Sequence, residues 1–159
     1  MYRIGIGNDI HRLEENKPLI LGGVRIESDV GAVGHSDADA LLHAVTDAIF
    51  GALALGDIGS HFSDKDEKWK NADSSIFLFE AVRLIKEKGF AVVNIDSTIN
   101  LEKPKLRPFI NAMRENVARI LDIEIGFVSI KAKTGEKVDA VGNRQAIKAE
   151  VVVLLEKKI

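Results

Sequence analysis

The feature that most limits the possible folds is the alternation of apolar and polar residues in VVNIDSTINL, residues 92–101. Successive side chains of a β-strand point to opposite faces, so this pattern predicts a strand with one apolar and one polar face. The expected apolar face holds Val93, Ile95, Ile99 and Leu101, and the expected polar face holds Asn94, Asp96, Thr98 and Asn100. A sheet of such strands needs a layer of helices on one face only.

The remaining patterns supply the other strands and the covering helices. Strands are expected at residues 2–12, 127–133 and 147–155, with a hairpin at 18–27 around Gly22 and Gly23. Helices are expected from a capping box at Ser36 and Asp39 to before Gly56, from Ser74 to Gly89, and from about Pro108 to Leu121. Residues 56–73 have the composition of a long acidic loop. This order predicts an α+β fold, with a single mixed β-sheet that carries its helices on one face, in one domain over residues 1–159.

Composition removes several classes of function. The 159 residues include no cysteine, which excludes disulfides, thiolate metal ligands and cysteine nucleophiles. The formal net charge is −2 with acids and bases interspersed, so we expect no nucleic-acid partner and no membrane anchor. No apolar run approaches the ~20 residues of a membrane helix, and the N-terminus lacks the apolar core of a signal peptide. A cytoplasmic location is the resulting expectation.

Asp9 and His11, in the stretch GNDIHRL, are the first candidate site residues. In a strand they share one face, whereas Ile4, Ile6 and Ile10 share the opposite face, which we expect to pack against the core. A carboxylate beside an imidazole is either a structural ion pair or part of a site.

A third ligand is available from the first predicted helix. His43 lies just off the apolar stripe of that helix, between Leu41 and Val45. An Asp-x-His pair with one helical histidine makes a set of two nitrogens and one oxygen, typical of a zinc site with an open fourth position. Spacing alone leaves a competing interpretation open, in which His43 is a polar helix residue and the strand pair lies on the surface.

Further polar residues accompany this candidate site. The segment HSDAD, residues 35–39, suits helix capping, and the free N–H groups of a helix start also suit an anion beside His35. Asp57, Asp64 and Asp66 are equally compatible with a solvated acidic loop. Both interpretations stay open for these residues.

Glu136 is a more specific candidate, because it follows a strand end and a Thr-Gly pair, a turn typical of a pocket wall. A site that gathered Asp9, Asp57 and Glu136 would repel an anionic substrate unless divalent cations bound there. The sequence contains neither a G-x-x-x-x-G-K-[ST] phosphate loop nor a G-x-S-x-G elbow. Metal-assisted phosphate chemistry is therefore the best interpretation of these residues.

The sequence resembles the 2-C-methyl-D-erythritol 2,4-cyclodiphosphate synthase family through the motifs GNDIH, GGVRI, AVGHSDADALLHAVTDAIFGALALGDIGSHF, STINLEKPKLRPFI and VSIKAKTGEK. The resemblance extends over essentially the whole chain. It implies cyclisation of 4-diphosphocytidyl-2-C-methyl-D-erythritol 2-phosphate with release of CMP, in non-mevalonate isoprenoid precursor biosynthesis. The substrate's own 2-phosphate would attack the β-phosphorus, so the protein would position the substrate and neutralise charge.

The resemblance also implies roles for the matching residues. Asp9, His11 and His43 match zinc ligands, and Glu136 matches the ligand of a second metal, Mg²⁺ or Mn²⁺. His35 and Thr134 match catalytic residues. Substrate contacts are implied at Ser36, Asp57, Ile58, Gly59, Phe62, Asp64, Asp66 and Lys133, and cytidine contacts at Pro104, Lys105, Leu106 and Ala132. Members of the family are homotrimers with sites between subunits, arranged around a central cavity.

Two segments depart from the family pattern. Many members have a run of threonines before the glutamate, whereas this chain has Lys133-Thr134-Gly135-Glu136. The arginine that often follows the glycine is displaced here, giving Gly142-Asn143-Arg144, which leaves any regulatory anion site in the central cavity open. Two other functions also stay open: a metal-dependent phosphohydrolase that uses water as the nucleophile, and a non-catalytic oligomer that binds a metal or a nucleotide.

Overall fold

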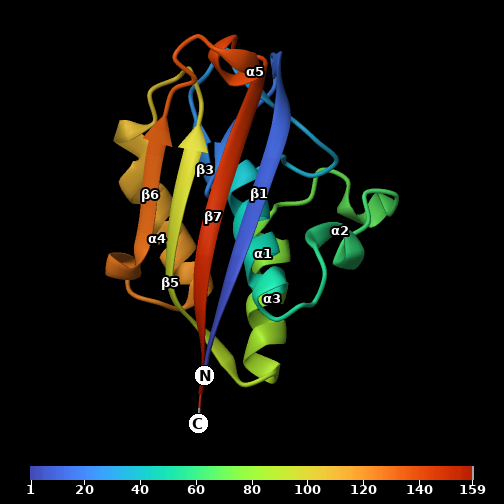
Figure 1. The fold of residues 1–159 in the computed structure, drawn as a ribbon. Coiled ribbons are helices and arrows are strands. Elements are labelled where there is room, and N and C mark those ends of the chain that lie inside the picture. Colours follow the sequence, from blue (N-terminus) through green and yellow to red (C-terminus); the bar gives the residue numbers. More distant parts are fainter. Residues whose placement is uncertain (159) are drawn as a thin grey trace.

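A five-stranded mixed β-sheet forms the centre of the molecule in the computed structural model, which describes residues 1–158 (Figure 1). Its strands are β1 (Tyr2–Glu15), β4 (Val30–Val33), β5 (Phe90–Asn100), β6 (Val128–Lys133) and β7 (Ala146–Lys157). The order across the sheet is β4-β1-β7-β5-β6. The β5–β6 pair is parallel and the other pairs are antiparallel, which confirms the predicted mixed sheet.

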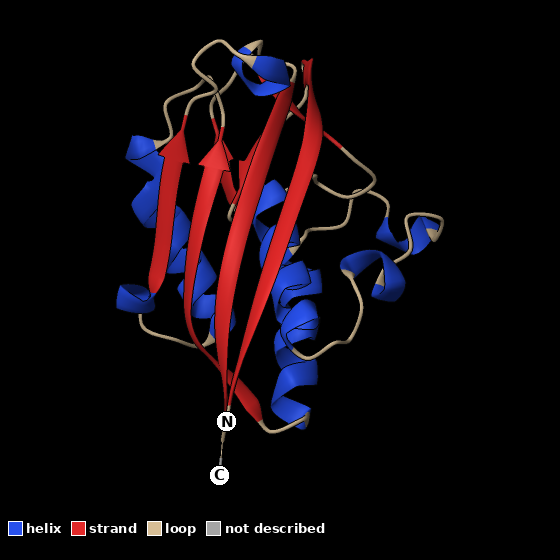
Figure 2. Ribbon diagram, viewed as in Figure 1, coloured by secondary structure: helices blue, strands red, loops and turns tan. Residues whose placement is uncertain are grey.

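Three long helices cover one face of this sheet (Figure 2). They are α1 (Ala40–Ala52), α3 (Ser75–Glu87) and α4 (Ile110–Leu121). The short helical segments are α2 (Ile58–His61), α5 (Asp139–Gly142), η1 (Glu67–Trp69), η2 (Arg107–Phe109) and η3 (Ile125–Phe127). The layered α+β arrangement is therefore as predicted. None of the helices in residues 1–158 has the length and apolar character needed to cross a membrane.

The hairpin forms as predicted, but it does not join the central sheet. Its strands β2 (Leu19–Leu21) and β3 (Val24–Ile26) make a separate two-stranded sheet, so the expectation of a single sheet was wrong. The reason lies in Asp39, whose carboxylate accepts from the N–H groups of Gly22 (3.0 Å) and Gly23 (2.7 Å) at the hairpin turn. These bonds fix the hairpin over the start of α1.

The first helix begins three residues later than predicted, after Asp39 and not after Ser36. Asp39 is the N-cap of α1 and accepts from the N–H of Leu42 at 3.0 Å, a position that the capping box had assigned to Ser36. The Ser36 hydroxyl instead accepts from Ala38 N, before the helix begins. Complete burial raises the pKa of Asp39 to about 6, even though three backbone N–H groups bond its carboxylate.

The faces of β1 are the reverse of the expectation. Ile4, Ile6 and Ile10 lie on the open face of the sheet, and their side chains are 70%, 73% and 61% exposed. The residues that meet α1 include Gly5 and Gly7, where an added Cβ would lie 1.9 Å from Ala48 O and 2.0 Å from Ala44 O. The helix approaches the strand so closely that only glycine fits, and this brings the Asp9 and His11 face against α1.

A smaller correction concerns β5. The register against β7 shifts between Val92 and Asn94, so that Val93 is the extra residue of a β-bulge. Val92 is buried in place of Val93, whereas Ile95, Ile99 and Leu101 are buried as predicted. An irregularity of one residue cannot be read from an alternating pattern, because it shifts the alternation without ending it.

Candidate metal centre

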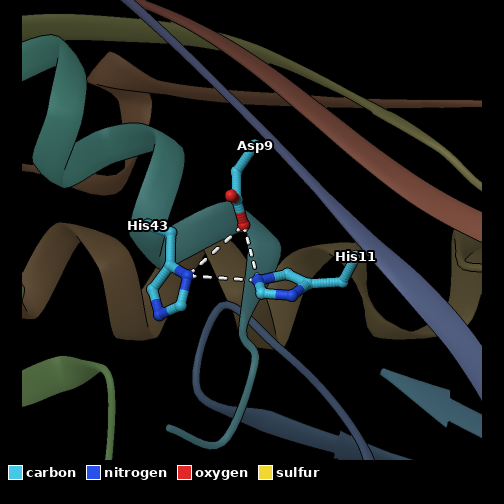
Figure 3. A group of neighbouring side chains, drawn as sticks. All are labelled: Asp9, His11 and His43. Atoms are coloured by element: carbon cyan, nitrogen blue, oxygen red, sulfur yellow. Dashed lines mark hydrogen bonds and ion pairs between the residues drawn. The ribbon is translucent and has the colours of Figure 1, made fainter. Parts of the chain in front are cut away.

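Three side chains from β1 and α1 converge on one point (Figure 3). Asp9 Oδ2 lies 2.7 Å from His11 Nε2 and 3.3 Å from His43 Nδ1, and the two nitrogens are 3.2 Å apart. Asp9 and His11 alternate to the same face of β1, and His43 lies in the first turns of α1, which packs on that face. The predicted convergence of these three residues is confirmed.

The tautomer of His11, set by its hydrogen bond to Val33, suits metal binding. His11 Nδ1 lies 3.0 Å from the carbonyl oxygen of Val33, which can only accept, so Nδ1 carries the hydrogen. In the neutral ring, Nε2 therefore presents its lone pair to the cluster. With the His11 ring in this neutral form, Asp9 Oδ2 is buried and receives no hydrogen bond, which is an unfavourable state for a carboxylate oxygen. One carboxylate oxygen and two imidazole nitrogens fit a divalent cation, which would satisfy that oxygen.

The electrostatics of the cluster follow from burial and close pairing. Burial opposes the ionisation of Asp9, but the two facing imidazoles outweigh it and hold the pKa of Asp9 well below its usual range. Burial likewise opposes the protonation of His11, yet the adjacent carboxylate of Asp9 outweighs it and raises the pKa of His11. Without a metal, therefore, the cluster stabilises a proton on His11, and this proton occupies the position that a cation would take.

A cavity of about 390 Å³ opens beside the cluster. It is lined by residues of β1, α1, α2 and the segment that leads to α3. From the predicted set, the lining includes His11, His35, Ser36, His43, Ile58, Gly59, Phe62 and Asp64. Trp69 and Phe77, which the sequence interpretation missed, add an aromatic wall in which Phe62 contacts both rings. The sequence did not mark these two residues as part of a cavity, because an aromatic residue in a loop or a helix is equally typical of the hydrophobic core.

Two predicted substrate residues, Asp57 and Asp66, act as helix caps and do not line this cavity. The Asp57 carboxylate caps α2 by accepting from Ser60 N at 2.8 Å, and hydrogen bonds from Ser60 hold its pKa below the usual range. Asp66 caps η1 through Lys68 N. The Asp66 carbonyl also accepts from His35 Nε2 at 3.1 Å, which ties this segment to the cavity wall.

Asp47, which was also missed, holds α2 in place. It lies one helical turn beyond His43, and its carboxylate accepts from Ile58 N at 2.7 Å. Half-burial raises its pKa. The sequence did carry a signal for it, because Asp47 follows His43 at helical spacing on the same face.

A second cavity, of about 430 Å³, lies at the ends of β5 and β6. It is lined by Leu101, Pro104, Lys105, Leu106, Arg107, Ile110, Lys131, Ala132, Lys133 and Thr134. The predicted cytidine contacts therefore share one cavity with Thr134 and Lys133. Glu136 is next to it, since Glu136 Oε1 accepts from the Thr134 hydroxyl at 2.9 Å, but it is not among the residues of the metal cluster.

The two cavities are separated by the packed core of the chain. Asp9 lies opposite Ala149, Ala149 opposite Ile99, and Ile99 beside Ala132, so the four residues form one row across β1, β7, β5 and β6. With strands about 4.8 Å apart, the row spans roughly 14 Å. Ala149 and Ile99, in the middle of the row, are fully buried. The expectation that Asp9 and Glu136 meet in one site is therefore not fulfilled within one chain.

Arg144, which the sequence marks as displaced, and His61, the remaining histidine, have partners of their own. Arg144 Nη2 donates to both carboxylate oxygens of Asp29, at 2.5 and 2.7 Å. His61 stacks on Phe50 with 4.1 Å between ring centroids, and its Nε2 donates to Leu55 O. His61 is thus a packing residue, and Arg144 joins the segment before β4 to the segment before β7.

Comparisons with known proteins agree over the full length of the chain. The sequence model described as the YgbB family matches residues 2–156. A protein of Fusobacterium nucleatum subsp. nucleatum named 2-C-methyl-D-erythritol 2,4-cyclodiphosphate synthase is 52% identical over 158 residues, covering 99% of each chain. A Geobacillus sp. (strain WCH70) protein of the same name is 51% identical, covering 99% of this chain and 100% of its own. A solved structure described as this synthase in a CDP-bound form is 41% identical with a TM-score of 0.90, covering 97% of this chain and 100% of the other.

Proposed function

This chain belongs to the YgbB family, and from that membership we propose that it is a 2-C-methyl-D-erythritol 2,4-cyclodiphosphate synthase. The 2-phosphate of 4-diphosphocytidyl-2-C-methyl-D-erythritol 2-phosphate attacks the β-phosphorus and forms a new P–O bond. The bond between the β-phosphorus and the oxygen that bridges to the α-phosphate breaks, so CMP leaves. This step belongs to non-mevalonate isoprenoid precursor biosynthesis. The observation that carries the proposal is the convergence of Asp9, His11 and His43 in a chain whose full-length relatives bear this name.

We assign zinc to the cluster of Asp9, His11 and His43 and a second divalent ion, Mg²⁺ or Mn²⁺, to Glu136. Two imidazoles and one carboxylate are a donor set that zinc prefers, whereas a lone carboxylate suits a harder ion that keeps most of its water. A divalent ion at such a position supplies positive charge that attracts phosphate oxygens and draws electron density from the phosphorus. The ring nitrogens of His11 and His43 and the carboxylate of Asp9 would hold that ion beside the first cavity.

The remaining residues position the substrate. His35, at the wall of the first cavity, and Thr134, at the wall of the second, are the proposed catalytic residues, which orient the reacting phosphates. The methylerythritol part is proposed to contact Ser36, Ile58, Gly59, Phe62 and Asp64 in the first cavity. Asp57 and Asp66, which cap α2 and η1 and do not line the cavity, are proposed to contact the same part of the substrate from these caps. The cytidine and its phosphates are proposed to contact the second cavity at Pro104, Lys105, Leu106, Ala132 and Lys133. Alignment of the two phosphates for in-line attack is the main contribution of the protein.

We propose that three copies of the chain assemble so that the first cavity of one copy faces the second cavity of its neighbour. The separation of the cavities within one chain by a buried core supports this arrangement. The exposed column of Ile4, Ile6 and Ile10 supports it too, because an apolar stripe of this kind on a sheet face is typical of a buried contact between copies. The open sheet faces would then surround a central cavity.

Phosphorus NMR of the reaction tests the proposed function. With the linear cytidine diphosphate substrate, we expect resonances of CMP and of a cyclic diphosphate in equal amounts. Inorganic phosphate or an acyclic diphosphate would indicate a phosphohydrolase with water as the nucleophile and would contradict the proposal. An unchanged substrate spectrum with metal and nucleotide bound would instead indicate a non-catalytic oligomer.

A further inference from the structure

Ser74 occupies an unusual position behind the metal cluster. It is the N-cap residue of α3 and is completely buried, yet its hydroxyl makes no capping bond to the helix. Serine at an N-cap normally accepts from a backbone N–H one turn into the helix. Here the Ser74 hydroxyl lies 2.8 Å from His43 Nε2 and is hydrogen-bonded to Asp37 Oδ1. The hydroxyl is therefore used for the ligand histidine and not for the helix.

The direction of these bonds follows from what each group can donate. A carboxylate only accepts, so the Ser74 hydroxyl donates to Asp37, and Ser74 N donates to the other oxygen of Asp37 at 3.1 Å. The hydroxyl oxygen is then left to accept, and the partner that faces it is the Nε2–H of His43. With the hydrogen fixed on Nε2, the lone pair of Nδ1 is directed at Asp9 and His11, where the metal is proposed to bind.

We propose that Asp37 and Ser74 form a relay that positions His43 for metal binding, by fixing its tautomer and its ring orientation. This inference deepens the proposed function and rests on the metal site assigned there. A carboxylate that acts on a ligand histidine through one hydroxyl strengthens the histidine as a donor. His11 has the simpler arrangement, in which the Val33 carbonyl accepts from Nδ1 directly.

The relay also joins His43 in α1 to the distant segment that leads into α3. Asp37 N donates to Ala72 O at 3.0 Å, so Asp37 and Ser74 both lie where the segment after α2 returns to α3. Ser36 is a second, longer partner of the same imidazole, because its hydroxyl is 3.1 Å from His43 Nε2. The Ser36 hydroxyl also lies 3.4 Å from that of Ser74, whereas its bond to Ala38 N leaves it without a bond to Asp37. The orientation of His43 thus depends on the correct closure of this segment over α1.

The test measures zinc affinity by competition with a chelator in the full-length protein. Parent, Ser74→Ala, Asp37→Asn, the double variant and Ser75→Ala are compared. Ser75→Ala is the matched control, because it removes a hydroxyl from the next position of the same helix start without touching His43. We expect Ser74→Ala to weaken zinc binding about 10-fold or more, the range found for partners of ligand histidines. The double variant should bind zinc no more weakly than Ser74→Ala alone, because Asp37 acts through Ser74.

The visible absorption of the Co²⁺-substituted protein gives a second readout, since it reports the ligand geometry. We expect it to change in Ser74→Ala and Asp37→Asn and to match the parent in Ser75→Ala. The relay is overturned if Ser74→Ala binds zinc within twofold of the parent, or if the two single effects multiply in the double variant. Should Ser74→Ala fail to fold, a folded Asp37→Asn with parental affinity overturns it equally. A parent that binds no zinc would contradict the metal site itself, which is a separate outcome.

Discussion

The two cavities of this chain differ in how completely one copy builds them. The proposed metal ligands come from β1 and α1, which approach each other closely at Gly5 and Gly7, and both histidines are held by further hydrogen bonds. The cavity at Pro104 and Thr134 is lined by residues of loops, strand ends and the start of α4, and its four cationic side chains, Lys105, Arg107, Lys131 and Lys133, are exposed. In the first region the fold itself holds the side chains in place, whereas the second region is a positively charged cavity that is open to solvent.

This difference fits two separate roles, metal binding in the first region and nucleotide binding in the second. Metal binding requires ligand atoms placed to within a fraction of an ångström, which a rigid strand–helix contact provides. Binding a nucleotide diphosphate requires positive charge and a concave surface, which loops provide with less packing. Disruption of the first region should therefore abolish metal binding, whereas changes in the second should weaken ligand affinity and leave the fold intact.

The largest expected effect comes from removing a ligand. His43→Ala leaves Asp9 and His11 with no third donor, so we expect zinc affinity to fall by more than ~100-fold. Metal analysis after dialysis measures the loss, and His61→Ala is the control, because its ring stacks on Phe50 outside the cluster. Equal zinc content in His43→Ala and the parent would show that this region is not a metal site.

The next effect tests whether close packing builds the cluster. Gly7→Ala places a Cβ about 2.0 Å from Ala44 O, so α1 must move away from β1. We expect a loss of roughly 1–3 kcal/mol in the free energy of unfolding of the metal-free protein, together with weaker zinc binding. Gly126→Ala is the matched control, since its Cβ meets nothing within 4 Å. Similar denaturation midpoints for the two variants would refute the packing argument.

A smaller effect is expected in the second region. Glu136→Gln removes a charge next to Thr134 without touching the cluster, so zinc binding should stay at the parental level. We expect the Mg²⁺ concentration that gives half-maximal activity to rise about 10-fold, because an amide is a poorer ligand for that ion than a carboxylate. Glu124→Gln, at an exposed position, controls for the loss of charge. Superimposable magnesium titrations of Glu136→Gln and the parent would remove Glu136 from the site.

The smallest effect is the pH dependence of the cluster. Zinc must displace the proton that His11 binds in the metal-free protein, and the pKa of His11 is raised above its ordinary value of 6.5. Zinc affinity should therefore begin to fall, by a few-fold, at a higher pH than for an ordinary imidazole. Asp9 stays ionised over this range because its pKa is lowered, so it adds no proton of its own. Affinity that stays constant down to pH 6.5 would contradict the raised pKa.

Patterns that depend on neighbouring residues could be predicted from the sequence. The helices, the alternation of β5 and the shared face of Asp9 and His11 follow from local periodicity, and the family motifs supplied the third ligand. The face of β1 that meets the helices was assigned wrongly, because isoleucine normally marks the covered face. Here Gly5 and Gly7 decide the packing, and the isoleucines are left on the open face.

Contacts between distant segments could not be predicted. The use of Ser74 for His43 depends on where the segment after α2 closes, and no local pattern in the sequence encodes that closure. The distance between Asp9 and Glu136 depends on the strand order, which places β7 and β5 between them. The motifs therefore identified the residues of a site, but only the sites between subunits that the resemblance implies indicated that one chain holds some of these residues apart.

Anomalous diffraction at the zinc edge, from crystals grown with zinc and CDP, tests the central claim most directly. We expect one strong peak per chain, between Asp9 Oδ2, His11 Nε2 and His43 Nδ1, with the diphosphate of CDP reaching it from the second cavity of a neighbouring copy. A peak elsewhere, no peak at all, or CDP bound away from the three ligands would contradict the account.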